Sequence, residues 1–371
     1  MENGIPNAVL PYHWTVQTLL RFIDSPIYNK GLPTQYLAFH GPSGPIGPQT
    51  LSESLGVVNS PPGLLPDVDD PEDVEDGSFP TPVVIPVPPN IYVGVEETGR
   101  CYPSFGRHEY GLPIDIDEQK RMELIHVKHK ILLGADYLAP IGTDPLRILD
   151  IGTGSGLWAM DVADATPSAH VVGVDLAPMA PMAIPPNCVF QTRDVEEDWP
   201  WPKNLFDFIY LREPLFCIRD WDKLLNQVYA HLLPGGWVEI ACTYMQPVCR
   251  GGRGMHAPDS SFTRICNKLM QACAAFGTPM RFPPQLRRYL DAKGFVNVKE
   301  RIFETPTSPF APEEWEQKVG LIDTMSLELG TPSFGLRTLS RAFGWSPAET
   351  ERKMASFKRE AMVLRRDAYF Q

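Results

Sequence analysis

The sequence has little of what secreted or membrane proteins need. Its seven cysteines are an odd number, lie far apart and include no CxxC pair, so they predict neither a disulfide framework nor a metal site. No apolar run reaches the roughly 18 residues that a spanning helix requires. The first residues, MENGIPNAVLPYHW, lack the basic and apolar regions of a secretory signal. We therefore expect no membrane span and a cytoplasmic location, or a nuclear one if the role is regulatory.

Basic residues are also scarce. The 371 residues contain 33 lysines and arginines against 45 acids, a formal net charge of -12. Because an acidic chain is repelled by a phosphate backbone, we expect no nucleic-acid partner. The imbalance is concentrated in residues 1–95, which hold ten acids, two bases and 16 of the 39 prolines.

This proline-rich acidic stretch is predicted to be an extension outside the organised part of the chain. Seven of its residues between 67 and 76 are acidic, and such a block repels itself and stays solvated. Residues 9–27 have the apolar spacing of a short amphipathic helix. That helix could cover the core or pair two subunits as a homodimer.

Strand and helix patterns alternate through residues 147–244. The strand patterns are RILDI (147–151), HVVGVD (170–175), CVFQTRD (188–194), FDFIYLR (206–212) and GWVEIACTY (236–244). Helices are expected from Leu157 and from Trp221. Alternation of this kind predicts a parallel sheet with helices on both faces, which is a Rossmann-like, doubly wound α/β fold.

Helical patterns flank this core. A helix is expected over residues 118–138, and the region from 245 to 371 is mostly helical, with one strand near 295–303. Ser346 followed by Pro347 has the start signals of a last helix. We therefore divide the chain into an extension (1–95), a helical lid (96–146), the core (147–244) and a cap (245–371).

Glycines at alternate positions follow the first core strand. Gly152, Gly154 and Gly156 come directly after Asp150, in the pattern GxGxG, whereas the dinucleotide fingerprint is GxGxxG. The difference favours S-adenosylmethionine, and a dinucleotide remains the alternative. Glycine lets the backbone approach a ligand closely, and Asp150 would supply negative charge near its ammonium and sulfonium groups.

Acids also end the next two strands. Asp175, 23 residues after Gly152, can accept hydrogen bonds from both ribose hydroxyls, and Asp194 can accept one from the adenine amine beside the Val195 amide. Each acid alone could equally be a strand-end cap. Open parallel sheets bind ligands at the carboxyl ends of their strands, so three acids there predict a cofactor site in a class I methyltransferase core. The same strand ends add two candidates, Leu176 and Arg212.

From about Gly99 to Tyr369 the chain resembles the fungal LaeA-like (velvet-associated) methyltransferases of secondary metabolism. The motifs that carry the resemblance are GLWAMDVAD, GVDLAP, DVEEDWPW, LLPGGWVEI and SPAETERKM. The resemblance implies a fold that binds S-adenosylmethionine, with a helical lid before the core and a substrate cap after it. It also implies that Tyr102, Tyr110 and His126 line or cover the cofactor, with Trp158 behind it.

The chain departs from the family after the fifth strand. Where the family commonly has a second glutamate and then paired aspartates, this chain has Cys242 and then Arg250-Gly251-Gly252-Arg253. Methyl transfer requires an oriented acceptor and, for a hydroxyl, a base that removes its proton. The candidates for these roles are Glu213, His129, His256 and Tyr244. His129 could equally pack over the core, and Glu213 could equally cap the next turn.

These features support a methyltransferase that acts on a hydrophobic polyketide-type or peptide-type small molecule. Apolar residues of the cap, such as Met245 and Phe276, suit such a substrate and would equally suit a helical core. Two alternatives stay open. A cyclase could bind the cofactor without transferring its methyl group, as the missing acids suggest, and a LaeA-like regulator could act through partners of the acidic extension.

Asp175→Ala is expected to weaken S-adenosylmethionine binding tens-fold or more. The substitution removes a charge-assisted bidentate contact worth about 2 to 3 kcal/mol. Isothermal titration calorimetry measures the change, and an unchanged affinity would mean that the cofactor binds elsewhere.

Overall fold

The computed structural model describes residues 94–142, 146–248, 261–280, 285–364 and 369–370, which belong to one compact unit. The expected helix at residues 9–27, the acidic block at 67–76 and His256 lie outside the described residues. Within the described ranges, no helix is both long and apolar enough to cross a membrane.

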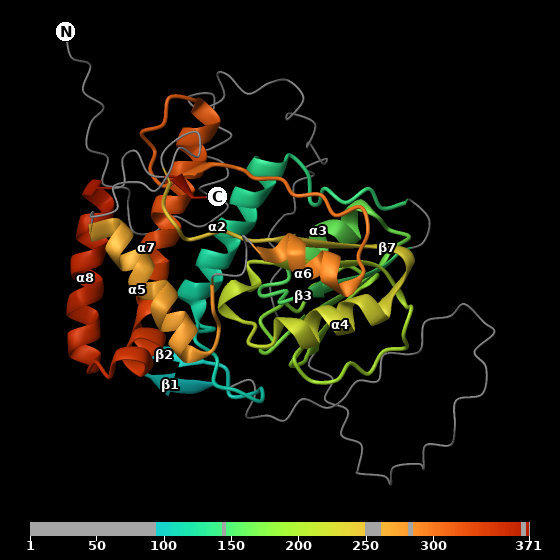
Figure 1. Ribbon diagram of the computed structural model, residues 1–371, viewed down its shortest axis with the longest axis horizontal. Helices are drawn as coiled ribbons and strands as arrows, with labels where there is room; N and C mark the ends of the chain where they lie inside the picture. Colours follow the sequence, from blue (N-terminus) through green and yellow to red (C-terminus); the bar gives the residue numbers. More distant parts are fainter. Residues whose placement is uncertain (1–93, 143–145, 249–260, 281–284, 365–368, 371) are drawn as a thin grey trace, which may run out of the picture. The chain divides into compact units, whose positions relative to one another are not determined.

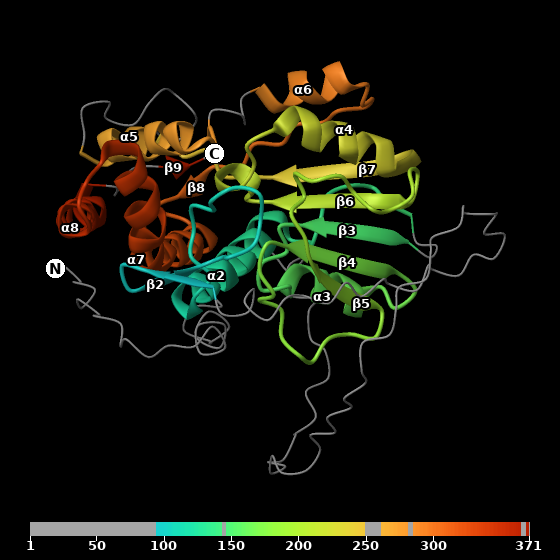
Figure 2. The ribbon, with the colours of Figure 1, turned by 90° about the horizontal axis from the view of Figure 1, so that it is seen from below.

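A five-stranded parallel sheet forms the centre of this unit (Figure 2). Its strands are β3 (Arg147–Ile151), β4 (His170–Asp175), β5 (Cys188–Thr192), β6 (Phe206–Arg212) and β7 (Leu232–Ala241). Their order is β5-β4-β3-β6-β7, so the chain moves outward from β3 to β5 and then crosses back to β6. The predicted doubly wound α/β fold is confirmed.

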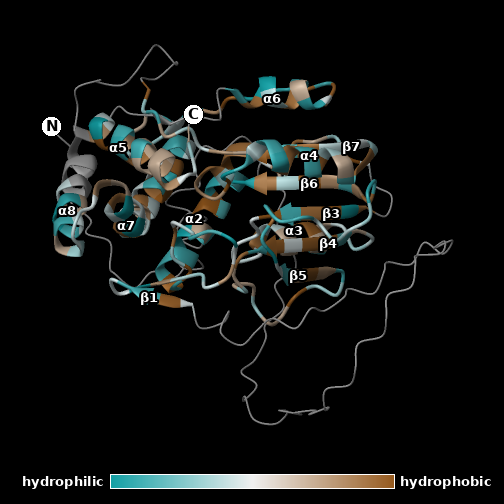
Figure 3. Ribbon diagram, turned by 60° about the horizontal axis from the view of Figure 1, so that its bottom comes forward, coloured by the Kyte–Doolittle hydropathy of each residue, from teal (hydrophilic) through white to brown (hydrophobic). Residues whose placement is uncertain are grey.

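Each face of the sheet is covered by its own apolar cluster. Ile148 and Phe208 point to the face that α3 (Leu157–Ala165) covers with Trp158 and Val162. Their neighbours, such as Leu149, point to the opposite face, where α4 (Trp221–His231) contributes Leu224, Leu225 and Val228. Because successive strand residues face opposite sides, near-continuous apolar strands bury both faces. Figure 3 shows these strands as largely hydrophobic.

A second layer of helices packs beside the sheet (Figure 1). It consists of α2 (Ile116–Leu133), α5 (Ser261–Phe276), α7 (Glu314–Phe343) and α8 (Pro347–Leu364), while α6 (Leu286–Lys293) lies against α4. The α8 start follows the predicted signals, since the Glu349 amide donates to Ser346 Oγ at 3.2 Å. Helix α2 contacts both α3 and α7, so it lies between the sheet and the other helices.

The start of α2 is fixed by Asp115. This carboxylate accepts a hydrogen bond from the Glu118 amide at 3.2 Å and forms a bidentate ion pair with Arg100 at 2.6 and 2.7 Å. Arg100 belongs to a hairpin of β1 (Val95–Glu97) and β2 (Arg100–Tyr102) that the sequence patterns do not predict. The helix ends at Leu133 because Gly134 adopts the left-handed conformation.

The predicted strand near 295–303 is wrong. Asn297 has φ of 57°, which interrupts an extended backbone, and Val296 and Ile302 are 80% and 64% exposed. Without a surface that buries them, their alternation stabilises no strand. A short antiparallel pair follows instead, formed by β8 (Thr305–Pro306) and β9 (Tyr369–Phe370).

Two glycines of α7 are expected to respond differently to alanine. A Cβ at Gly320 would lie 1.9 Å from the backbone oxygen of Ser308, whereas a Cβ at Gly335 would meet the flexible side chain of Met354 at 2.6 Å. Gly320→Ala must separate two backbones and should lower the free energy of unfolding by about 1 to 3 kcal/mol. In Gly335→Ala, Met354 can move, and the gain in helix propensity of about 1 kcal/mol offsets the strain. Equal effects in urea denaturation would contradict this account of the packing.

Candidate functional site

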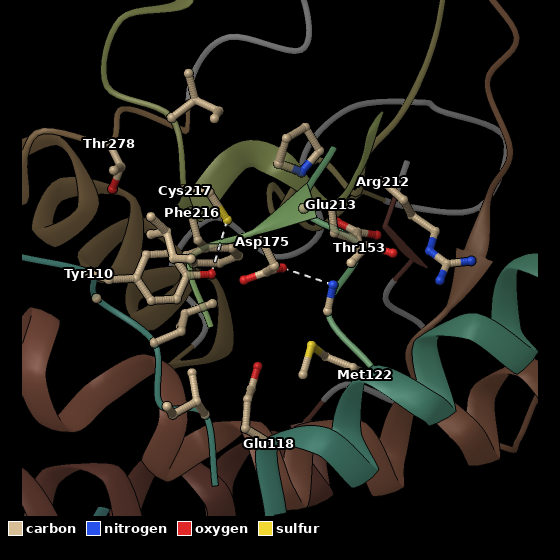
Figure 4. Close-up of a pocket in the computed structure, with 18 of the residues that line it drawn as sticks. Tyr110, Glu118, Met122, Thr153, Asp175, Arg212, Glu213, Phe216, Cys217 and Thr278 are labelled. Atoms are coloured by element: carbon tan, nitrogen blue, oxygen red, sulfur yellow. Dashed lines mark hydrogen bonds between the residues drawn. The ribbon is translucent and has the colours of Figure 1, made fainter. Parts of the chain in front are cut away.

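A cavity lies at the carboxyl edge of the sheet (Figure 4). Segments that follow β3, β4, β5, β6 and β7 line one side, and α2, α7 and residues 108–114 line the other. This is the edge where strand order reverses between β3 and β6, the usual ligand position in open parallel sheets.

The glycine turn after β3 presents its backbone to this cavity. Gly152, Gly154 and Gly156 have φ of 70°, 57° and 78°, which side chains rarely adopt. A Cβ at Gly152 would meet nothing within 4 Å, while one at Gly154 would lie 2.8 Å from Met122 Sδ. Gly156 differs from the other two, because its Cβ would collide with the Phe190 ring at 2.6 Å and it does not line the cavity.

The three strand-end acids occupy different positions. Asp150 lies beneath the turn, where its carboxylate accepts a hydrogen bond from Thr153 Oγ1 at 2.6 Å and burial raises its pKa to about 6. It does not line the cavity. Asp175 does, and it accepts a hydrogen bond from the Gly154 amide at 2.8 Å. Burial also raises the pKa of Asp175. The turn is therefore fixed by one acid from below and by another from β4.

The loop at 106–114 covers the adjoining part of the cavity. Asp194 lines the cavity and accepts hydrogen bonds from the Arg107 and Glu196 amides at 2.9 and 3.0 Å. Leu176 and Val195 lie beside it on the cavity wall. Tyr110 also lines the cavity, with its hydroxyl 3.2 Å from Cys217 Sγ. Burial raises the pKa of Tyr110 well above its ordinary value, so the hydroxyl stays neutral.

Glu213 follows β6 directly and faces the cavity. Its backbone is left-handed, with φ of 51°, and its carboxylate accepts hydrogen bonds from the Thr243 amide and hydroxyl at 3.0 and 2.6 Å. Burial opposes its ionisation, but the hydrogen bonds from Thr243 and the positive charge of Lys128 hold the pKa of Glu213 below its ordinary value. The carboxylate is therefore charged at neutral pH.

His129 lies behind Glu213 and does not line the cavity. Its Nδ1 is 2.9 Å from the Ile125 carbonyl oxygen, and its Nε2 is 3.6 Å from Glu213 Oε1. Burial lowers the pKa of His129 to about 4, so the ring is neutral. Because a carbonyl can only accept, we assign the ring proton to Nδ1. The Nε2 lone pair then faces the carboxylate.

Arg212 also lines the cavity and is supported from behind. Its Nη1 donates to His126 Nδ1 at 3.1 Å, and His126 Nε2 contacts Asp161 at 3.0 Å. Burial lowers the pKa of His126. His126 does not itself line the cavity; it lies one contact away and orients Arg212.

Three other predicted residues lie away from the cavity. Tyr102 is fully buried beneath Arg337, whose guanidinium carbon is 3.6 Å from the ring centroid. Trp158 stacks on Tyr210 at 3.9 Å in the core. Tyr244 packs against the core, while its neighbours on either side line the cavity. These three aromatic residues thus pack within the fold and do not line the cavity.

The sequence patterns missed one side of the cavity. Helix α2 lines it with residues at helical spacing, namely Glu118, Arg121, Met122, Ile125 and Lys128. Glu118 and Lys128 are each only 2% exposed. The sequence signal that could have predicted this side is the presence of charged residues on the same helix face as Met122 and Ile125. Figure 3 shows hydrophilic positions on α2. Helix α7 carries a similar signal at Asp323, which lies one helical turn before Leu327.

Comparison with known proteins places the chain among methyltransferases. A family described as "Methyltransferase domain" matches residues 124–300. Methyltransferase pytC of Aspergillus terreus is 34% identical over 266 residues, which cover 71% of this chain and 81% of the relative. The secondary metabolism regulator laeA of Aspergillus niger is 31% identical over 84% of this chain and 83% of its own. Protein-methionine methyltransferase laeA of Emericella nidulans is 32% identical over 74% and 73%.

Trp158→Ala is expected to lower stability without a matching loss of cofactor affinity. The side chain extends from α3 onto β6 and is 1% exposed. Its removal should therefore lower the free energy of unfolding by about 3 to 5 kcal/mol. Chemical denaturation measures this cost, and calorimetry on the folded protein measures affinity. Trp158→Phe, which keeps a ring against Tyr210, should lose less stability. A tens-fold loss of affinity with unchanged stability would place Trp158 in the site after all.

Proposed function

Because the chain belongs to the LaeA-like family of S-adenosylmethionine-dependent methyltransferases, we propose that it methylates a hydrophobic small molecule of fungal secondary metabolism, of polyketide or peptide type. The observation that carries the substrate class is the apolar wall of the cavity. Phe216 stacks on Phe334 with ring centroids 4.6 Å apart, and Met245, Phe276 and Leu327 line the same space. A wall of this kind suits a flat, apolar acceptor.

The residues around the glycine turn fit S-adenosylmethionine. Gly152 leaves open space where other residues would place a Cβ, and the carboxylate of Asp175 accepts a hydrogen bond from the Gly154 amide while it lines the cavity.

We assign the methionine part of the cofactor to this turn, the ribose to Asp175 and Leu176, and the adenine to Asp194 and Val195. Tyr110 and Arg212 would close the two ends. When bound, the cofactor supplies a methyl group on a positively charged sulfur.

Glu213 is the proposed base. It is charged, it lines the cavity, and both of its oxygens are held by Thr243, so its position is fixed before an acceptor arrives. An acceptor proton taken by Glu213 would lie near the Nε2 lone pair of His129. The pair can therefore share the proton, which lowers the cost of removing it. Tyr244 does not line the cavity and His256 lies outside the described residues, so the proposal rests on the other two candidates.

The proposal predicts labelled product when the full chain is incubated with methyl-labelled S-adenosylmethionine and a hydrophobic metabolite extract. Glu213→Gln keeps the size of the side chain but cannot accept the proton. We expect its kcat to fall by about 10²- to 10⁴-fold while its affinity for the cofactor stays close to that of the parent. Liquid chromatography with mass detection identifies the product, and calorimetry reports the affinity.

The same assay separates the alternatives. A rearranged metabolite formed without consumption of the cofactor would favour a cyclase. Label found on protein would favour an activity like the one named for the Emericella nidulans relative. Cofactor binding with no labelled product of any kind would contradict the proposed substrate class.

A further inference from the structure

A buried lysine in the cavity wall has spare hydrogen-bonding capacity. Lys128 of α2 is 2% exposed and lines the cavity. Its Nζ donates to Asp323 Oδ1 of α7 at 2.9 Å, and this is the one hydrogen bond that it makes within the described part of the chain. An ammonium group carries three N–H donors, and burying it is costly unless they are satisfied. The remaining donors are therefore available to a ligand in the cavity.

The surroundings of Lys128 are those of a site that handles a proton. Its ion-pair partner Asp323 comes from α7, and it interacts electrostatically with Glu213 at the end of β6 and with His129 of α2. Its positive charge helps to hold the pKa of Glu213 down, yet among the described residues no ion pair within 4.0 Å joins Lys128 to Glu213. An acceptor atom that enters the cavity can thus meet a cation and a carboxylate from different elements.

Two other cationic groups that line the cavity, Arg121 and Arg219, are more fully engaged. Arg121 forms hydrogen bonds to both oxygens of Glu118 and lies over the Phe334 ring at 4.9 Å. Arg219 donates to the carbonyl oxygens of Phe276 and Glu109. Lys128 differs because it is compact, almost fully buried and held by a single oxygen. A point charge with free donors suits one oxygen atom better than it suits an amine, which it would repel when protonated.

We propose that Lys128 is a catalytic residue that binds the acceptor oxygen, and that the acceptor is an enol or phenol hydroxyl on a flat apolar molecule. This rests on the methyl transfer proposed above. The hydroxyl proton passes to Glu213 and its bonding electrons stay on the oxygen beside Lys128. The oxygen then forms a bond to the methyl carbon as the methyl–sulfur bond breaks, and the sulfur keeps that electron pair. Asp323 acts as a positioning residue for the lysine.

An enol or phenol is the class of hydroxyl that these groups can ionise. Phenols lose their proton near pH 10, within reach of a carboxylate aided by a lysine, whereas aliphatic alcohols are far less acidic. The stacked Phe216 and Phe334 rings suit the flat body of such a molecule. Stabilisation of developing negative charge by a fixed cation in a buried site is a common source of catalysis.

The test uses 4-nitrophenol, whose anion absorbs visible light, bound to the full chain with S-adenosylhomocysteine. In the parent protein the bound probe should ionise about one pH unit or more below the free probe, because Lys128 stabilises the anion. Lys128→Met should abolish this shift. Lys128→Met alone leaves the buried Asp323 carboxylate without its ion-pair partner, which can destabilise the fold. The double variant Lys128→Met with Asp323→Leu removes both charges and so avoids that problem. Lys318→Met is the matched control, because Lys318 is also buried but does not line the cavity.

The proposal is overturned if the parent protein does not bind the probe, if the bound probe shows no shift, or if the double variant keeps it. Its failure can be told from failure of the proposed function. Calorimetry with S-adenosylhomocysteine and the labelled-product assay test methyl transfer independently of the probe. A product methylated on nitrogen, carbon or sulfur would leave methyl transfer intact and would refute the oxygen acceptor.

Discussion

The candidate site depends on one geometric constraint, which is the adjacency of the parallel strands β3 and β6. Because their connections leave in opposite directions, to β4 on one side and to β7 on the other, their carboxyl ends open a crevice that no crossover covers. The glycine turn enters the crevice from β3, and Glu213 enters it from β6. The left-handed backbone at both points turns the chain sharply, so that an amide cradle and a carboxylate face the same space. The helices α2 and α7 then close it.

Closing the crevice with α2 carries an energetic cost. The helix turns Glu118, Arg121 and Lys128 toward the cavity, where each must be desolvated. Ion pairs with one another or with Asp323 recover part of that cost, but buried pairs are seldom more stabilising than apolar residues of similar size. A stretch of α2 that only covered the sheet would need none of these charges. Their presence is better explained by a ligand that gains from them than by stability.

The sequence predicted what depends on local periodicity. Alternation through residues 147–244 gave the sheet and its flanking helices, and the GxGxG spacing located the turn that lies in the cavity. It did not predict which neighbour each side chain meets. The family resemblance implies that Tyr102 and Trp158 lie at the cofactor, but they pack against Arg337 and Tyr210. The α7 residues that line the cavity come from far along the chain. The strand expected near 295–303 failed because periodicity alone cannot supply a surface that buries it.

The carboxylate after β6 also bears on the acids that the chain lacks after β7. At the position of the expected glutamate stands Cys242, whose thiol has its pKa raised by burial to about 12 and therefore stays neutral. The next residue, Thr243, donates both its amide and its hydroxyl to Glu213. This end of the cavity therefore keeps a negative charge. Glu213, after β6, supplies it, and Thr243, after β7, holds it in place. An enzyme that binds its cofactor only as a structural element would have little use for a charged carboxylate fixed in this way, so the arrangement favours chemistry in which a proton is removed.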